Sequence, residues 1–183
     1  MRIIFFSVAL LLSVTLGVAQ TQVSLNSKIY LELPSGTVKF ADTENLSKMK
    51  EAFGEQLAQT LTKNTEVYKL DNMIFRFKVL EKFPSTYIEN VNKVFDNSYG
   101  RSTSALYSRE KQLYKNYQKV SKNAGDGKVV YALYDTDDNA SLDFHYYNPI
   151  KKAVFSLKID YPTTDKVKVF RAVDRMIETI VVK

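Results

Sequence analysis

The sequence has no cysteine, and its 183 residues include only six glycines, four prolines and one histidine. Without cysteine the chain can form neither a disulfide framework nor a thiolate metal site, so packing and hydrogen bonds must supply its stability. No linker, low-complexity block or internal repeat interrupts the chain. One long hydrophobic run occurs, at the N-terminus, and no second run follows it. We therefore expect one globular domain without a further membrane span.

The N-terminal run is typical of a cleaved signal peptide covering residues 1–19. Arg2 precedes an apolar stretch from Ile3 to Leu16, small residues follow at positions 17–19, and Gln20 begins a polar segment. The apolar stretch is shorter than the roughly 20 residues that a membrane-spanning helix needs. We expect a mature domain of residues 20–183 that is exported to the periplasm or secreted, with no transmembrane span after cleavage.

The charge balance is modestly basic, with 26 lysines and arginines against 20 acidic residues and a formal net charge of +6. This excess favours attraction to an acidic protein, an acidic glycan or an anionic membrane surface. It is too small to indicate nucleic-acid binding. The expected partners are therefore an unknown protein, a glycan or an anionic surface, and no nucleic acid.

Hydrophobic periodicity predicts the order of helices and strands. Alternation of apolar and polar residues predicts six strands, at residues 28–33, 67–70, 73–80, 128–135, 141–147 and 153–161. Apolar residues spaced three or four apart predict four helices, at about 43–61, 84–100, 103–122 and 163–182. The resulting order, β-α-β-β-α-α-β-β-β-α, predicts an α+β fold with a mainly antiparallel sheet of about six strands packed with helices.

The sharpest local prediction is a hairpin around Asp71-Asn72. Both residue types tolerate a left-handed backbone, and a two-residue loop is the commonest hairpin connection. Such a loop pairs Leu70 with Met73 and Tyr68 with Phe75, which places the large apolar side chains on one face.

The element order resembles the PsbP-like fold. The resemblance lies in the first strand ending in Leu33-Pro34, the helix followed by a hairpin, and the closing strands that lead into Val167–Val182. It implies an antiparallel sheet with helices on both sides and a non-catalytic binding or assembly role.

Two local motifs contain residue types that occur in metal or catalytic sites. Asp135, Asp137 and Asn139 have the spacing that opens a calcium loop, but Ala140 and Tyr146 stand where that loop needs glycine and glutamate. We therefore interpret the segment as a turn. The single histidine, His145, cannot build a multi-histidine metal site, and we expect it at the surface beside Asp143. The sequence predicts no metal, no cofactor and no nameable catalytic residue.

Basic and aromatic residues interleave in the expected helix at 103–122. Spaced as on one helix side, they form a candidate partner-binding face of Lys111, Tyr114, Lys115, Lys119 and Lys122. A solvated helix surface is the plainer interpretation of such a row.

Three functions remain open from the sequence. The first is an exported, non-enzymatic binding or assembly module. The second is a carrier for a small apolar or amphipathic ligand, held between the sheet and the thinly apolar helix at 103–122. The third is a hydrolase with dispersed carboxylates, for which no spacing selects a pair among Glu55, Glu66, Glu81, Asp96 and Asp160.

Overall fold

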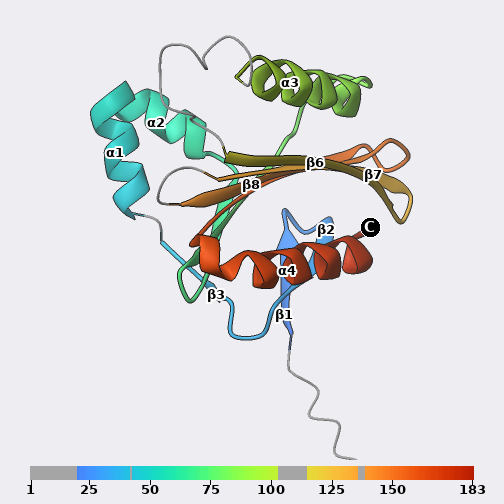
Figure 1. The fold of residues 1–183 in the computed structure, drawn as a ribbon, viewed down its shortest axis with the longest axis horizontal. Coiled ribbons are helices and arrows are strands. Elements are labelled where there is room, and N and C mark those ends of the chain that lie inside the picture. The colour runs from blue at the N-terminus through green and yellow to red at the C-terminus, as the bar shows by residue number, and fades with distance from the viewer. Residues whose placement is uncertain (1–19, 42, 103–114, 136–138) are drawn as a thin grey trace, which may run out of the picture.

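A seven-stranded, entirely antiparallel sheet forms the middle layer of the computed structural model, which describes residues 20–41, 43–102, 115–135 and 139–183 (Figure 1). The strand order is β3-β4-β5-β9-β8-β7-β6. Its strands are β3 (Val38–Lys39), β4 (Thr65–Leu70), β5 (Met73–Val79), β6 (Lys115–Ala124), β7 (Gly127–Asp135), β8 (Ala140–Asn148) and β9 (Ala153–Tyr161). The predicted α+β class with a mainly antiparallel sheet is confirmed.

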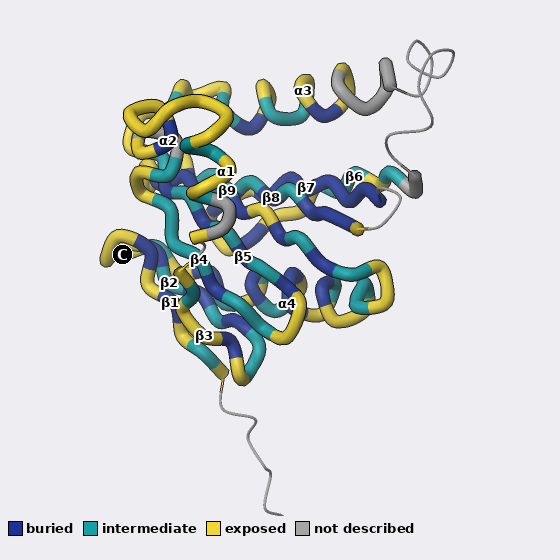
Figure 2. Tube along the Cα trace, turned by 90° about the vertical axis from the view of Figure 1, so that its left-hand side faces the viewer, coloured by how far each residue is buried: buried dark blue, intermediate teal, exposed yellow. Residues whose placement is uncertain are grey.

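Helices cover both faces of this sheet. The outer face carries α1 (Thr43–Phe53), α2 (Glu55–Thr62) and α3 (Tyr87–Ser102), as Figure 2 shows. The inner face carries α4 (Lys166–Thr179), which follows a 3-10 turn at Thr163–Asp165, together with a second sheet. That three-stranded sheet contains β1 (Thr21–Leu25), β2 (Ile29–Leu33) and β10 (Val181–Val182), with β2 in the middle. Within the described residues, no helix has the length and apolar character needed to span a membrane.

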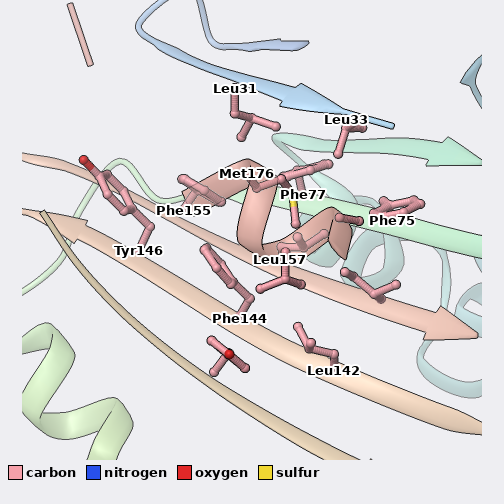
Figure 3. Close-up of a cluster of buried hydrophobic side chains, with 14 of the residues drawn as sticks. Leu31, Leu33, Phe75, Phe77, Leu142, Phe144, Tyr146, Phe155, Leu157 and Met176 are labelled. Atoms are coloured by element: carbon pink, nitrogen blue, oxygen red, sulfur yellow. The ribbon is translucent and has the colours of Figure 1, made fainter. Parts of the chain in front are cut away.

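The main core lies between the inner face and the layer formed by α4 and the small sheet (Figure 3). Phe75 and Phe77 of β5 pair with Ile159 and Leu157 of β9, and all four side chains are almost completely buried. From the other side, β2 and α4 supply apolar side chains, among them Leu31, Leu33 and Met176. The strict alternation of the strand sequences produces this face, because successive side chains of a strand point to opposite sides.

The hairpin of β4 and β5 has the predicted register. Leu70 pairs with Met73 and Tyr68 pairs with Phe75. Asp71 adopts a positive φ of 52°, which its short polar side chain tolerates. Turn chemistry and hydrophobic pattern thus specify the same pairing.

The helix predicted over residues 43–61 is two helices. Gly54 separates α1 from α2, with φ 79° and ψ 161°, a region that only glycine occupies readily. Because of this break, the apolar residues of 43–61 do not lie along one side of a single helix, and Phe53 and Leu57 are exposed. Gly54 therefore lies between the end of α1 and the start of α2.

The helix predicted over 103–122 is wrong for residues 115–122, which belong to strand β6. β6 pairs with β7 across the Ala124–Gly127 hairpin, and backbone hydrogen bonds to β7 override a sequence with few apolar residues. The segment at 20–27, expected as a polar leader, contains β1. Its two buried residues, Val23 and Leu25, are too few to make a clear periodic signal.

Candidate functional site

The first candidate site is a groove of about 320 Å³ beside α4, called here the α4 groove. α4 contributes Lys168, Arg171 and Arg175, which share one helix side because of their i, i+3, i+7 spacing. The floor of the groove is apolar. Its other wall is formed by the residues directly after β2 and by the residue directly before β1. The other lining residues are Leu70, Met73, Ala172, Pro34, Ser35 and Gln20.

Two of the three cations are held by carboxylates that do not line the groove. Arg175 donates from Nη2 and Nε to Glu32 Oε2, at 2.6 and 3.1 Å, and from Nη2 to Gln20 Oε1 at 2.8 Å. Lys168 Nζ lies 3.1 Å from Asp165 Oδ1 and 3.6 Å from Asp71 Oδ2. The hydrogen bond to Asp165 raises the pKa of Lys168. Both side chains are therefore oriented before any partner arrives.

Arg171 differs from its two neighbours. Its side chain is exposed, and among the residues that the structure describes it has no hydrogen-bonding or carboxylate partner. A guanidinium is a rigid fork of donors that matches a carboxylate. The α4 groove therefore presents one uncompensated cation beside an apolar floor.

The second candidate site lies on the outer face of the sheet, has a volume of about 260 Å³, and is called here the sheet groove. Met49 of α1 and Thr62 of α2 form one wall. Its floor consists of polar side chains from the central strands, namely Arg76, Lys78, Asp143, His145, Ser156 and Lys158. Their positions follow from register, since Arg76 pairs with Lys158 and Ser156 pairs with both Lys78 and His145.

His145 is half-buried beneath α3 and does not bind a carboxylate. Its Nδ1 lies 2.8 Å from the Tyr87 hydroxyl, and its ring packs edge-on against Phe95 with centroids 5.5 Å apart. Burial lowers the pKa of His145 to about 4, so the ring is neutral at pH 7. The prediction placed His145 at the surface, whereas the structure has it half-buried; it does line the same groove as Asp143, which accepts a hydrogen bond from the Tyr134 hydroxyl.

The sheet groove does not contain a hydrolytic relay. Asp143, His145 and Ser156 line it together, yet His145 is bound to Tyr87 and is too weak a base for general-base catalysis near neutral pH. Nearby Asp160 is held by Arg76, by Ser141 Oγ at 2.7 Å and by Lys158 at 3.8 Å. This geometry gives the hydrolase alternative no support.

The other dispersed carboxylates are also engaged. Glu66 and Glu81 share a third groove, where Glu66 accepts from Lys39 and Tyr68, each at 3.0 Å, and Glu81 accepts from Asn64 at 2.9 Å. Glu55 and Asp96 form ion pairs on separate helices. In the part of the chain described, no group of three or more acidic or histidine side chains could hold a metal ion.

The candidate lysine face is not a row on one helix side. Lys119 of β6 pairs with Asp96 of α3, whereas Lys122 pairs with Asp174 of α4 at 3.0 Å. The two lysines thus contact opposite sides of the sheet, as expected for strand residues three apart. Lys115 begins β6, and Lys111 and Tyr114 lie outside the described residues. A partner-binding role for these five residues stays a prediction.

The calcium-like segment is only partly described. Asp135 ends β7 and Asn139 precedes β8, while residues 136–138, and with them Asp137, lie outside the described residues. The signal-peptide prediction for residues 1–19 also falls outside them. Sequence reasoning missed the α4 groove, although the spacing of Lys168, Arg171 and Arg175 on a predicted helix was available as a signal.

Comparison with known proteins gives structural similarity only. No family model matches the chain, and no curated protein matches it. The Saccharomyces cerevisiae Ran-binding protein Mog1p is similar at a TM-score of 0.46 and 10% sequence identity, over 90% of this chain and 95% of that chain. A single-substitution mutant of protein Mog1 is similar at a TM-score of 0.46 and 9% identity, over 90% and 96%.

These comparisons correct two sequence-based predictions. The resemblance to the PsbP-like fold is corrected, since the similar solved structures are Mog1 proteins. The prediction of a periplasmic or secreted location is not retained either, since the similar solved structures are of a Ran-binding protein.

Proposed function

We propose that this chain is a non-enzymatic binding module that holds a segment of a protein partner in the α4 groove. The observation that carries the proposal is the apolar floor beside Arg171, the cation without a carboxylate partner among the described residues. An apolar floor next to a few fixed polar groups is the usual composition of a binding site.

Two walls of the groove are held in place by the rest of the fold. α4 is anchored in the core through Val169, Val173 and Met176, which are fully buried. The opposite wall is a turn closed by Thr37, whose hydroxyl and amide both bond to the Pro34 carbonyl, at 2.7 and 3.2 Å. Gly36 adopts a φ of 83° in that turn. A site that is formed before binding loses less entropy when the partner arrives.

The lining specifies the chemistry of the segment. An apolar side chain of the partner would cover Leu70, Met73 and Ala172, and a neighbouring aspartate or glutamate would bind Arg171. A polypeptide can supply both groups within a few residues. An acidic glycan would leave the apolar floor uncovered, so a protein segment fits better.

The carrier hypothesis loses its structural motivation. It placed a ligand under a thinly apolar helix at 103–122, but residues 115–124 form strand β6. The helix that covers this part of the sheet is α3, which packs closely through Ile88 and Phe95, both 4% exposed.

Selection from a random peptide display library against the full chain tests the proposal. We expect enriched peptides in which a large apolar residue adjoins aspartate or glutamate. Their affinity should fall about tenfold or more, equivalent to about 1.4 kcal/mol, for Arg171→Glu. Lys93→Glu, an equal charge change at an exposed position of α3, should leave affinity unchanged. Enriched peptides without acidic residues, or equal binding to Arg171→Glu, would contradict the proposal.

A further inference from the structure

The part of the α4 groove that α4 itself forms places an apolar surface directly among cations. Of the four residues that α4 contributes, only Ala172 is apolar. It follows Arg171 in the chain and shares a helix side with Lys168, four residues before it, and Arg175, three residues after it. A group that covers Ala172 is therefore flanked by positively charged side chains.

Arg171 is the cation with which an occupant of the groove can pair. Glu32 holds Arg175 at 2.6 Å and Asp165 holds Lys168 at 3.1 Å, whereas Arg171 has no carboxylate partner among the residues that the structure describes. A guanidinium binds a carboxylate through two parallel hydrogen bonds. The groove is thus complementary to one carboxylate and one apolar group that lie next to each other.

The geometry of a polypeptide limits where these two groups can be neighbours. In an extended segment, adjacent side chains point to opposite sides, and the next side chain on the same side is about 7 Å away. A C-terminal residue differs, because its carboxylate and its side chain are attached to the same Cα atom. The groove volume of about 320 Å³ is at the lower end for ligand sites, which also suits a chain end better than a longer segment.

We propose that the partner segment bound in the α4 groove is the C-terminus of a protein that ends in a large apolar residue. The terminal carboxylate binds Arg171, and the terminal side chain covers Leu70, Met73 and Ala172. This inference rests on the proposed function and names the part of the partner that enters the groove.

The other wall of the groove favours a peptide over a fatty acid, which also joins a carboxylate to an apolar group. Ser35 contributes a hydroxyl to this wall, and Gln20 contributes an amide whose oxygen accepts a hydrogen bond from Arg175 at 2.8 Å. The backbone that precedes a terminal residue can form hydrogen bonds with such groups. A hydrocarbon chain would cover them without providing a partner, which costs free energy.

Matched peptides test the inference on the full chain. Each is a short glycine–serine peptide with an acetylated N-terminus, so that it carries no charge except the one under test. The first ends in leucine with a free carboxylate, the second in leucine amide, and the third in serine with a free carboxylate. Titrations followed by backbone amide NMR give the dissociation constants. We expect the first peptide to bind at least about tenfold more tightly than the other two, because each of those lacks one of the two contacts.

Variants test whether Arg171 recognises the terminal carboxylate. Arg171→Gln should reduce the preference for the free carboxylate over the amide to within about twofold. Lys93→Gln removes the same charge from an exposed position of α3 and should retain the full preference. The amide fingerprint of each variant verifies its fold.

The inference is overturned if the amide or the serine peptide binds as tightly as the first peptide, or if no peptide binds. N-acetylleucine is a further probe, and equal binding of it would show that the groove takes a small acid instead of a chain end. An amidated peptide with an internal leucine beside aspartate separates this inference from the proposed function. If that peptide binds as tightly as the first and depends on Arg171, the C-terminal inference falls and the protein-segment proposal stands; if neither kind of peptide binds, both fall.

Discussion

The two faces of the central sheet come from the same strands, yet they differ in what covers them. On the inner face, Phe75, Phe144 and Phe155 are completely buried under α4 and the small sheet. On the outer face, the neighbouring residues Arg76, His145 and Ser156 are only half-buried and line a groove. The comparison teaches that one alternating sequence can place a fully buried core on one side of a sheet and a polar, partly exposed groove on the other.

The largest expected effect breaks the inner face. Phe144→Ala removes a ring that stacks on Phe155 and Tyr131, with centroids 5.7 and 6.2 Å apart, and leaves a cavity in the main core. We expect the free energy of unfolding to fall by about 3–5 kcal/mol. Urea denaturation followed by circular dichroism measures it. Ser156→Ala, on the outer face of β9, should change it by less than about 0.5 kcal/mol; equal costs would remove the distinction between the faces.

The next largest effect comes from overpacking the inner face where β7 begins, at Gly127. A Cβ on Gly127 would lie 2.5 Å from Cε2 of Tyr146, whose ring is buried and stacks on Phe155 at 5.4 Å. We expect Gly127→Ala to cost about 1–3 kcal/mol, because the ring has little room to move. In a double-mutant cycle, Tyr146→Leu should reduce this cost. Additive effects would show that the strain arises elsewhere.

Acidification tests the outer face through the titration of His145, which has no counterpart on the inner face because His145 is the only histidine of the chain. The pKa of His145 is lowered by burial from 6.5 to about 4, so the unfolded chain binds a proton that the folded chain refuses. Stability is therefore complete above the unfolded pKa and is lost as the pH falls from about 6.5 towards 4. We expect a loss of about 1–2 kcal/mol between pH 7 and pH 5. His145→Gln should flatten this part of the pH profile, and an unchanged profile would exclude His145 as its cause.

The smallest expected change in the free energy of unfolding is at the exposed end of α1. Phe53 is 57% exposed at the end of α1, next to the break at Gly54. Phe53→Ser should change the free energy of unfolding by less than about 0.5 kcal/mol, as is usual for surface substitutions. Thermal unfolding by differential scanning fluorimetry gives a rapid test. A cost above about 1 kcal/mol would mean that Phe53 packs in solution.

Local signals in the sequence were sufficient for much of the fold. The β4–β5 hairpin and the β7–β8–β9 meander follow from alternation and turn residues, because all three pairings are between neighbours in the chain. Strand β6 could not be predicted this way, since its polar sequence takes its structure from β7. Gly54 was ambiguous for a related reason: a glycine inside a helical pattern is either tolerated or a break, and only tertiary contacts decide.

The candidate sites were less accessible from sequence than the fold. The α4 groove joins Leu70 and Met73 to residues about a hundred positions later in the chain. The sheet groove depends on the pairing of β5 with β9, which no local pattern specifies. The sequence shows which residue type stands at each position. Only the structure shows which of these residues are neighbours across the sheet.

The pairing of β5 with β9 also affects the order in which parts of the sheet can form. Arg76 and Asp160 are 84 residues apart, so the strands on either side of this seam cannot meet until most of the chain has left the ribosome. Closing so long a loop is slow compared with forming the local hairpins. Pulse-labelled hydrogen exchange should therefore protect the β7–β8–β9 meander first and the β5 amides later. Until that seam closes, the chain holds two partial sheets with exposed apolar faces, and this is the stage at which we expect it to be most prone to aggregation.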